Sequence, residues 1–214
     1  MAADVNPRRT YDSPRRQEQA RLTRRAVLDA ARELFLEQGY AKTTVAAVAG
    51  QAAVSVETVY KAFGNKAGLV KAVFDVAVVG DDDPVPMLQR EFVRQNAAEP
   101  DPRRKLAGYG QHLVAVGART AAILLVVRDA AATDAGAAGV WEQLQAERLA
   151  GMTAFAQHLA EGGHLRSGVS ADEARDVLWT YNSVELWHLL VEQRGWSPER
   201  FGTWVGHQLI AALL

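Results

Sequence analysis

The sequence of 214 residues contains no cysteine, which excludes thiol catalysis, disulfide bonds and any zinc site built on sulfur ligands. Its seven prolines and 17 glycines are too few for a fibrous or low-complexity chain. No apolar run approaches the ~20 residues that a membrane-spanning helix needs, and no signal-peptide core follows the arginine-rich N-terminus. We therefore expect a cytoplasmic protein that has no membrane partner.

The chain also lacks an excess of charge of one sign, because 24 Lys and Arg face 25 Asp and Glu for a net charge of −1. The balance differs along the chain. Residues 1–74 hold 12 basic and 7 acidic side chains, whereas residues 75–214 hold 12 basic and 18 acidic ones. A basic N-terminal part and an acidic C-terminal part predict two regions that have different partners.

Alternation of polar and apolar residues between turn signals is absent, so we predict an all-α fold without a sheet. Residues 1–17 are polar and rich in arginine, and we expect a flexible basic arm there. An acidic run that ends in Pro84 separates a small domain of short helices, residues 18–80, from a larger helical domain, residues 84–214.

Capping residues predict where the helices begin and end. The starts are marked by Thr44, Ser55, Asn65, Ser170 and Ser197, with Glu173 completing a capping box and Pro198 in a first helical position. Gly39 is expected to end the first long helix in a left-handed conformation. In the larger domain, helices are expected over about 85–98, 103–116, 119–132, 138–160, 171–194 and 198–213.

Two short helices joined by a tight turn, behind a longer helix and a basic arm, are typical of a helix-turn-helix DNA-binding domain. In the second helix, Val59 and Phe63 are suited to the core. Other residues offer groups that bind bases or phosphates: Thr44, Ser55, Val56, Glu57, Thr58, Tyr60, Lys61 and Lys66. Spacing alone leaves open a three-helix bundle whose charges only face solvent.

The residue identities between positions 22 and 74 add a family resemblance. They are the run Ala30-Ala31-Arg32-Glu33-Leu34-Phe35-Leu36-Glu37-Gln38-Gly39-Tyr40, then Thr43-Thr44-Val45, Val48-Ala49, Val54-Ser55, Thr58-Val59-Tyr60, Phe63, Asn65-Lys66 and Leu69. In register, these closely resemble the DNA-binding domain of TetR-family (tetracycline-repressor-like) transcriptional regulators. The resemblance implies an all-helical homodimer with an N-terminal helix-turn-helix domain and a divergent ligand-binding and dimerisation domain behind it.

The resemblance also implies a role for each residue of the helix-turn-helix. Phosphate contacts are implied for Thr44, Tyr60 and Lys66. Base contacts are implied for Val56, Glu57 and Thr58, with Ser55 as the cap of the recognition helix. Glu57 equally suits a helix N-terminus, where its negative charge opposes the helix dipole.

Three positions depart from the family pattern. Ala53 stands where the family usually has a glycine in the turn, and a left-handed alanine costs about 1 kcal/mol relative to glycine. Ala67 replaces a common acidic residue and Gly68 follows it, so the first turn of the linking helix is expected to be weak.

The larger domain is expected to pair with a second copy and to bind a ligand. Apolar faces on the last two helices predict the dimer interface, represented by Leu186, Leu190, Phe201, Trp204 and Val205. Bulky aromatic residues with polar tips predict a pocket for an aromatic or amphipathic effector, with Tyr109, His112, Trp141, Phe155 and Trp179 as candidates. Both sets could instead be core residues of a monomer.

Enzyme motifs are missing: there is no phosphate-binding glycine loop, no His-Glu-x-x-His and no nucleophile elbow. Two Glu-x-x-His spacings, Glu161/His164 and Glu185/His188, lack a matching partner, so we predict no catalytic residue, metal or cofactor. We expect a ligand-responsive repressor that binds a palindromic operator on double-stranded DNA as a homodimer and is released by a small-molecule effector. The alternative is a helical DNA-binding protein without an effector.

Overall fold

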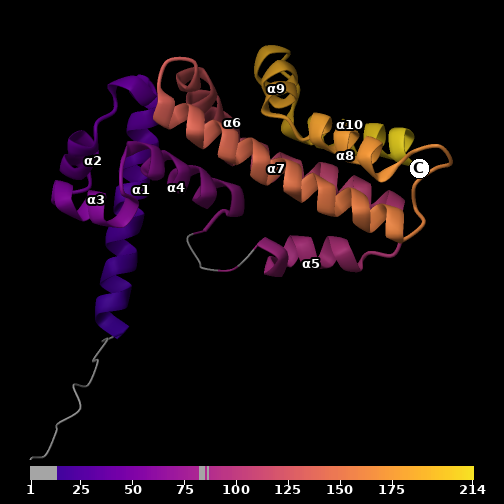
Figure 1. Ribbon diagram of the computed structural model, residues 1–214, viewed down its shortest axis with the longest axis horizontal. Helices are drawn as coiled ribbons and strands as arrows, with labels where there is room; N and C mark the ends of the chain where they lie inside the picture. The colour runs from indigo at the N-terminus through magenta and orange to yellow at the C-terminus, as the bar shows by residue number, and fades with distance from the viewer. Residues whose placement is uncertain (1–13, 82–84, 86) are drawn as a thin grey trace, which may run out of the picture.

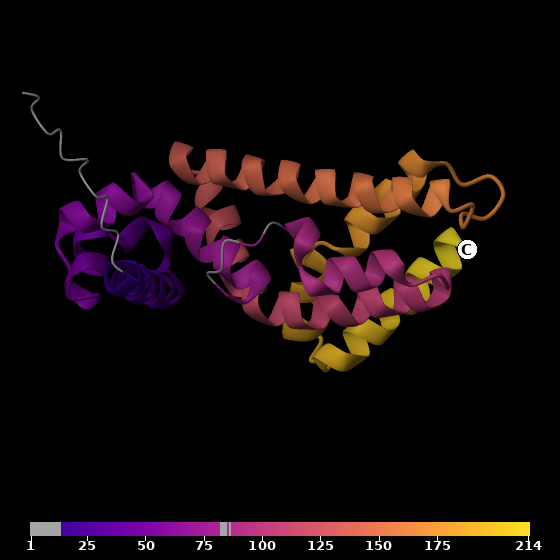
Figure 2. The ribbon, with the colours of Figure 1, turned by 90° about the horizontal axis from the view of Figure 1, so that it is seen from below.

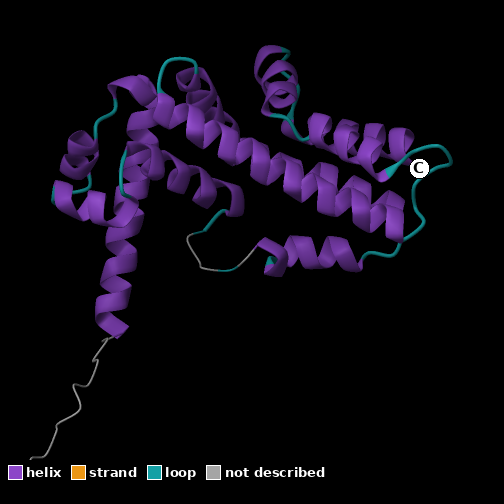
Figure 3. Cartoon of the chain, viewed as in Figure 1, coloured by secondary structure: helices purple, strands orange, loops and turns teal. Residues whose placement is uncertain are grey.

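The computed structural model describes residues 14–81, 85 and 87–214, and these residues form helices joined by loops, with no strand among them (Figure 3). The all-α fold predicted from the sequence is confirmed. No helix in the described ranges is long and apolar enough to cross a membrane.

Four helices form the N-terminal part: α1 (Pro14–Lys42), α2 (Val45–Gln51), α3 (Val56–Phe63) and α4 (Lys66–Val79). Because α1 begins at Pro14, residues 14–17 of the expected arm are helical, and the rest of the arm lies outside the described residues. Gly39 has a φ of 80° and kinks α1 where a left-handed stop was expected. The hydroxyl of Thr43 donates to the carbonyl of Gly39 at 2.8 Å and stabilises this bend.

The predicted caps of the short helices are confirmed. The side chain of Thr44 accepts from the backbone of Ala47, and that of Ser55 accepts from Thr58. Asn65 in turn accepts from the N–H of Gly68 at 2.8 Å. Each cap satisfies a backbone donor that the first turn of a helix leaves unpaired.

The larger part begins with a 3₁₀ turn and is otherwise made of long helices. Its elements are η1 (Met87–Gln89), α5 (Glu91–Ala98), α6 (Pro102–Ala131), α7 (Ala135–Glu161), α8 (Ala171–Tyr181), α9 (Val184–Trp187), the π-helical segment η2 (His188–Gln193) and α10 (Pro198–Leu213). Helices α1 to α3 gather at one end of the molecule, and α6 and α7 extend from there towards the opposite end, where the chain terminates (Figures 1 and 2).

Three predictions of helix bounds are wrong. The expected helix over 85–98 begins only at Glu91, because Arg90 before it is extended and separates it from the 3₁₀ turn η1. The expected helices over 103–116 and 119–132 are one helix, α6, because Gly117 lies inside it as a packing residue: a Cβ there would lie 2.3 Å from the Trp187 ring. The expected helix over 171–194 is interrupted after Tyr181, because the side chain of Ser183 caps a new helix, α9, by accepting from Leu186. The capping box of Ser170 is present as predicted.

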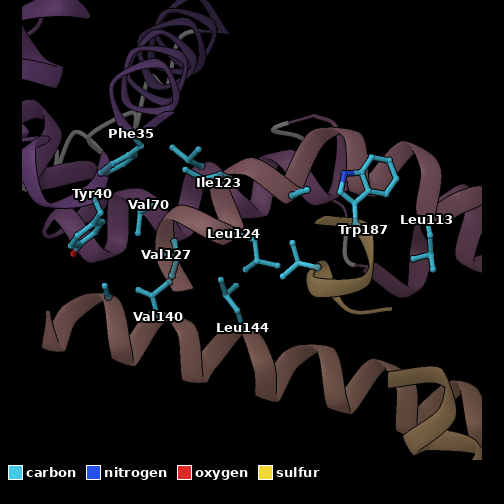
Figure 4. Packing of buried hydrophobic residues seen from close by; sticks show 14 of the residues in the cluster. Phe35, Tyr40, Val70, Leu113, Ile123, Leu124, Val127, Val140, Leu144 and Trp187 are labelled. Carbon is cyan, nitrogen blue, oxygen red and sulfur yellow. The ribbon is translucent and has the colours of Figure 1, made fainter. Parts of the chain in front are cut away.

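A continuous apolar core joins the two parts (Figure 4). The rings of Phe35 and Tyr40 stack at the end of α1, with centroids 5.8 Å apart, and both side chains are buried. Ile123 and Val127 of α6 continue this cluster, and Val140 of α7 projects towards Val127. The shared core holds the N-terminal helices against α6 and α7.

Candidate functional site

The turn between α2 and α3 contains a left-handed alanine. Ala53 has a φ of 53°, as its place at a position where the family usually has glycine implies, and it is the one non-glycine residue with positive φ in the described chain. The N–H of Val54 donates to the carbonyl of Ala49 at 3.0 Å and that of Ala53 to Gly50 at 3.2 Å. These bonds fix the angle at which α3 leaves α2.

Helix α3 has one buried and one exposed face. Val59 is buried and Phe63 is half-buried, as predicted. The side chains expected to meet DNA are exposed and cluster on α3 and on the start of α2: Thr44, Ser55, Val56, Glu57, Thr58, Tyr60 and Lys61. Tyr60 is 50 % exposed and Val56 39 %, so the exposed face of α3 offers apolar as well as polar groups to a partner.

Lys66, the first residue of α4, is half-buried. Its ammonium donates to the carbonyl of Tyr40 at 3.0 Å and lies 4.1 Å from the centre of the Tyr40 ring. An ammonium has three N–H donors, so this hydrogen bond leaves two for a phosphate. The Tyr40 ring and carbonyl therefore position the Lys66 ammonium and leave two of its N–H donors free for a phosphate.

A cavity of about 690 Å³ lies in the larger part and is lined mainly by apolar side chains. Its wall comes from α4, α5, α6, α7 and the junction of α8 with α9. Three of the five predicted ligand contacts line it: Tyr109, His112 and Phe155. Trp141 and Trp179 are half-buried but do not line it, and the Trp179 ring instead supports the guanidinium of Arg148 at 4.2 Å.

The two predicted polar residues in the wall are both held uncharged. Burial raises the pKa of the Tyr109 phenol well above its usual range, although the Arg148 charge acts in the opposite direction. Burial and then the positive charge of Arg119 lower the pKa of His112 to about 4. The His112 ring lies flat on Phe92, with centroids 3.6 Å apart and an angle of 4° between planes.

Sequence reasoning missed Arg148, a basic side chain of α7 that lines the cavity. Its Nη1 donates to the carbonyls of Trp179 (2.7 Å) and Asn182 (2.9 Å), and its Nη2 donates to Gln145 Oε1 (2.7 Å). A signal was available, because Arg148, Met152 and Phe155 follow the i, i+4, i+7 spacing of one helix face, and a lone charge in such a stripe is unusual.

A second polar group at the cavity joins α4 to α7. Lys71 bridges Asp75, at 2.6 Å on its own helix, and Glu147 of α7, at 3.1 Å. Burial disfavours the charged lysine, but the hydrogen bonds and charges of the two carboxylates outweigh it and raise the pKa of Lys71. Both carboxylates line the cavity, so its acidic groups are already paired with a cation.

The residues predicted for a dimer interface divide into two groups. Phe201 and Val205 lie inside the chain's own core, because α10 packs along α6 and turns this face inward. Leu186, Leu190 and Trp204 are half-buried and keep part of their surface. The Trp204 ring contacts other aromatic rings edge-on, those of Tyr181 and Trp196, with centroids 5.6 and 5.7 Å apart.

The Glu-x-x-His residues of α9 and η2 have other partners. His188 Nδ1 is 2.6 Å from Glu192 Oε2, and Glu185 faces Arg128 at 3.7 Å. Within the described ranges, no group of three His, Asp or Glu side chains is placed to hold a metal ion.

Comparison with known proteins identifies the N-terminal part. Residues 27–73 match the family model described as bacterial regulatory proteins of the tetR family. An uncharacterised HTH-type transcriptional regulator, YvkB of Bacillus subtilis, is 44 % identical over 52 residues, which cover 24 % of this chain and 28 % of that protein. The match to this curated relative therefore spans less than a third of its length.

Solved structures share the fold over most of the chain. NalD of Pseudomonas aeruginosa, the secondary repressor of the MexAB-OprM multidrug efflux pump, superposes with a TM-score of 0.68 at 22 % identity, covering 92 % of this chain and 98 % of that one. FadR of Bacillus subtilis, solved in complex with stearoyl-CoA, gives 0.68 at 16 % identity and covers 89 % and 99 %. The N-terminal part is therefore similar to bacterial regulatory proteins of the tetR family, and most of the chain shares its fold with these solved structures.

Proposed function

We propose that this protein is a homodimeric transcriptional repressor that binds a palindromic DNA operator through α3 and leaves it when a small-molecule effector enters the cavity. The observation that carries the proposal is the course of α4. This helix begins at Lys66, beside the recognition helix, and its later residues Phe74, Val78 and Val79 form part of the cavity wall. A ligand in the cavity thus touches the same helix that positions the DNA-contacting surface.

The chemistry of the α2–α3 surface supports DNA binding. Tyr60 and Lys61 offer donors to phosphates, and the exposed N-terminus of α3 presents Thr58 and the methyl groups of Val56. Donors of this kind fix a protein on the phosphate backbone, while an apolar side chain can contact a thymine methyl. Residues 1–74 carry five more basic than acidic side chains, 12 against 7, which favours a polyanionic partner.

The relatives are consistent with the effector half of the proposal. FadR was solved with stearoyl-CoA bound, and NalD is a repressor of a multidrug efflux pump. The cavity of about 690 Å³ lies within the usual range for small-molecule sites, roughly 300–1,000 Å³. A coupling of about 1–3 kcal/mol between the cavity and the DNA surface is enough for a useful response.

A helix-turn-helix dimer reads two half-sites about 34–36 Å apart, so the proposal requires a two-fold dimer. The partly exposed aromatic cluster of Tyr181, Trp196 and Trp204 is suited to the interface between copies. Sedimentation equilibrium should give twice the chain mass of 23.3 kDa. A monomer at micromolar concentration would contradict the dimer.

The DNA half of the proposal is tested by footprinting on the intergenic DNA beside the protein's own gene, followed by fluorescence anisotropy on the protected palindrome and on a scrambled duplex. The palindrome should bind at least about 10³-fold more tightly. Lys66→Ala should weaken binding to both duplexes and lower the slope of log affinity against log salt by about one. Arg94→Ala, on exposed α5, is the matched control and should leave the slope unchanged.

Equal affinity for both duplexes at moderate salt would rule out an operator-specific regulator. If Lys66→Ala changes only the preference between sequences, Lys66 contacts bases and not a phosphate. Thermal-shift screening of aromatic and amphipathic compounds tests the effector half, because a ligand that binds the folded state raises the melting temperature.

A further inference from the structure

We propose that the cavity takes an amphipathic monoanion, a carboxylic acid with an alkyl or aryl tail, and that Arg148, Tyr109 and Asn182 bind its carboxylate. This inference rests on the proposed function and specifies the chemistry of the effector. The three residues come from α6, α7 and the C-terminal end of α8, and all three line the cavity. They form a corner that is rich in donors and poor in acceptors.

Arg148 brings a positive charge that no carboxylate within the described residues neutralises at ion-pair distance. A guanidinium has five N–H donors, and three of those of Arg148 are used by two backbone carbonyls and the amide oxygen of Gln145. The carboxylate of Glu185 influences it from farther away, but Glu185 is exposed and faces Arg128. Half-buried Arg148 therefore keeps both an uncompensated charge and free donors at the cavity wall.

Tyr109 and Asn182 supply donors that lack a strong acceptor. The Tyr109 hydroxyl donates to Met152 Sδ at 3.2 Å, and the Asn182 amide reaches the same sulfur at 3.6 Å. A thioether is a weak acceptor, so neither donor recovers what it would gain from an oxygen. A carboxylate of the ligand would offer two oxygens to donors that now share one sulfur.

The other ionisable groups that we describe at the cavity are either ion-paired or uncharged. Asp75 and Glu147 share the ammonium of Lys71, so these three groups together keep one net negative charge on the side of the cavity formed by α4. His112 remains uncharged at neutral pH, and its flat contact with Phe92 makes it part of an apolar wall. Arg148 thus provides the one unpaired charge among the described residues that line the cavity.

The rest of the wall determines the other end of the ligand. Trp187, Leu124, Phe155 and Val116 are among the apolar side chains that line it. Apolar surface of this kind is suited to a hydrocarbon tail and would leave a second charged group without a partner. The donors around Arg148 favour a ligand with an anionic head, and the apolar wall of the same cavity favours a ligand with an apolar tail.

The test uses three probes that share a ten-carbon tail: decanoate, 1-decanol and decylamine, each below the concentration at which it aggregates. Isothermal titration calorimetry on the full chain should give a decanoate affinity at least tenfold higher than those of the alcohol and the amine. Arg148→Gln should remove most of this preference and leave the affinity for 1-decanol within threefold. Arg104→Gln, on the exposed face of α6, should bind all three probes as the wild type does.

Arg148 also holds the end of α8, so Arg148→Gln could unfold. Tyr109→Phe serves as the second variant, because it removes one hydroxyl whose present acceptor is a weak one. It should lower the affinity for decanoate about three- to tenfold and leave that for 1-decanol unchanged. The wild-type comparison of the three probes needs no variant to fold.

The outcomes separate the two proposals. If 1-decanol or decylamine binds as tightly as decanoate, the anionic class is wrong while a ligand-binding cavity stands. A preference for decanoate that persists in both variants would show that the acid binds elsewhere. If no probe binds and the palindrome is still recognised, the inference about the effector fails while operator binding stands.

Discussion

The guanidinium of Arg119, in the middle of α6, donates from Nε to the carbonyl of Ala77 at 2.7 Å. Its Nη2 donates to the next carbonyl, that of Val78, at 2.8 Å, so one side chain caps the C-terminal end of α4. Arg32 of α1 donates in turn to the carbonyl of Arg119 at 3.0 Å. Three helices are therefore tied together where the N-terminal part meets the cavity.

Removing this cap should loosen α4. Arg119→Ala leaves the carbonyls of Ala77 and Val78 without their charged donor, and hydrogen bonds to a charged group contribute about 1.5–3 kcal/mol. We expect the free energy of unfolding in urea to fall by about that amount, with faster amide hydrogen exchange in the last turn of α4. Arg94→Ala should change neither quantity. Unchanged exchange in α4 of Arg119→Ala would show that the cap does not hold this helix.

The crossing of α6 and α10 predicts a second effect. A Cβ on Gly110 would lie 2.4 Å from the carbonyl oxygen of Gly202 and 2.7 Å from the nitrogen of Gly206. Gly110→Ala must therefore push the two backbones apart, and overpacking of this kind costs about 1–3 kcal/mol. Thermal unfolding should give a lower Tm.

Gly108, two residues earlier on α6, is the matched control, because a Cβ there meets only the Asn96 side chain, at 4.0 Å. Gly108→Ala should raise the free energy of unfolding by up to about 1 kcal/mol through helix propensity. If both alanine variants are equally stable, the backbones at this crossing are free to separate.

Features that depend on neighbours along the chain could be predicted from the sequence. The caps at Thr44, Ser55 and Ser170 follow from a side chain and the next turn, so their residue types are sufficient. The left-handed conformation of Ala53 is implied by the resemblance to a family that usually has glycine at this position of the turn. These local features determine most of the N-terminal helices.

Features that depend on distant contacts could not be predicted. The sequence predicts a break between residues 116 and 119, yet Gly117 lies inside α6, and the ring of Trp187, 70 positions later, packs beside it. Periodicity shows that Phe201 and Val205 share an apolar face, but it cannot tell whether α6 or a second chain covers that face. The cavity corner at Arg148 likewise needs α6, α7 and the end of α8 to be brought together.

The strained turn of the helix-turn-helix predicts a stabilising substitution. Ala53→Gly relieves a left-handed conformation that costs alanine about 1 kcal/mol, so the free energy of unfolding should rise by about 0.5–1 kcal/mol. Ala46→Gly is the control, because the same change at an exposed position of α2 should lower the free energy of unfolding by a similar amount. A loss of stability in Ala53→Gly would indicate that the methyl group makes a contact worth more than the strain.

The His112–Phe92 stack predicts a dependence of stability on pH. The pKa of His112 is lowered to about 4 in the folded protein by burial and by Arg119, against about 6.5 in the unfolded chain. Between these two values the unfolded chain binds a proton that the folded protein excludes, so stability falls as the pH decreases from about 6.5 towards 4.

His112→Phe removes this proton and keeps an aromatic ring against Phe92. The free energy of unfolding should fall between pH 7.5 and pH 5.0. After allowing for the partial exposure of His112, its contribution to this fall should be about 1 kcal/mol. Urea unfolding at both pH values should therefore show that the free energy of unfolding falls by about 1 kcal/mol less in His112→Phe than in the wild type. His207→Phe, at an exposed position of α10, should keep the wild-type loss. Equal losses in His112→Phe and the wild type would mean that the folded protein accepts the proton on His112, and the apolar wall assigned to that side of the cavity would then carry a charge.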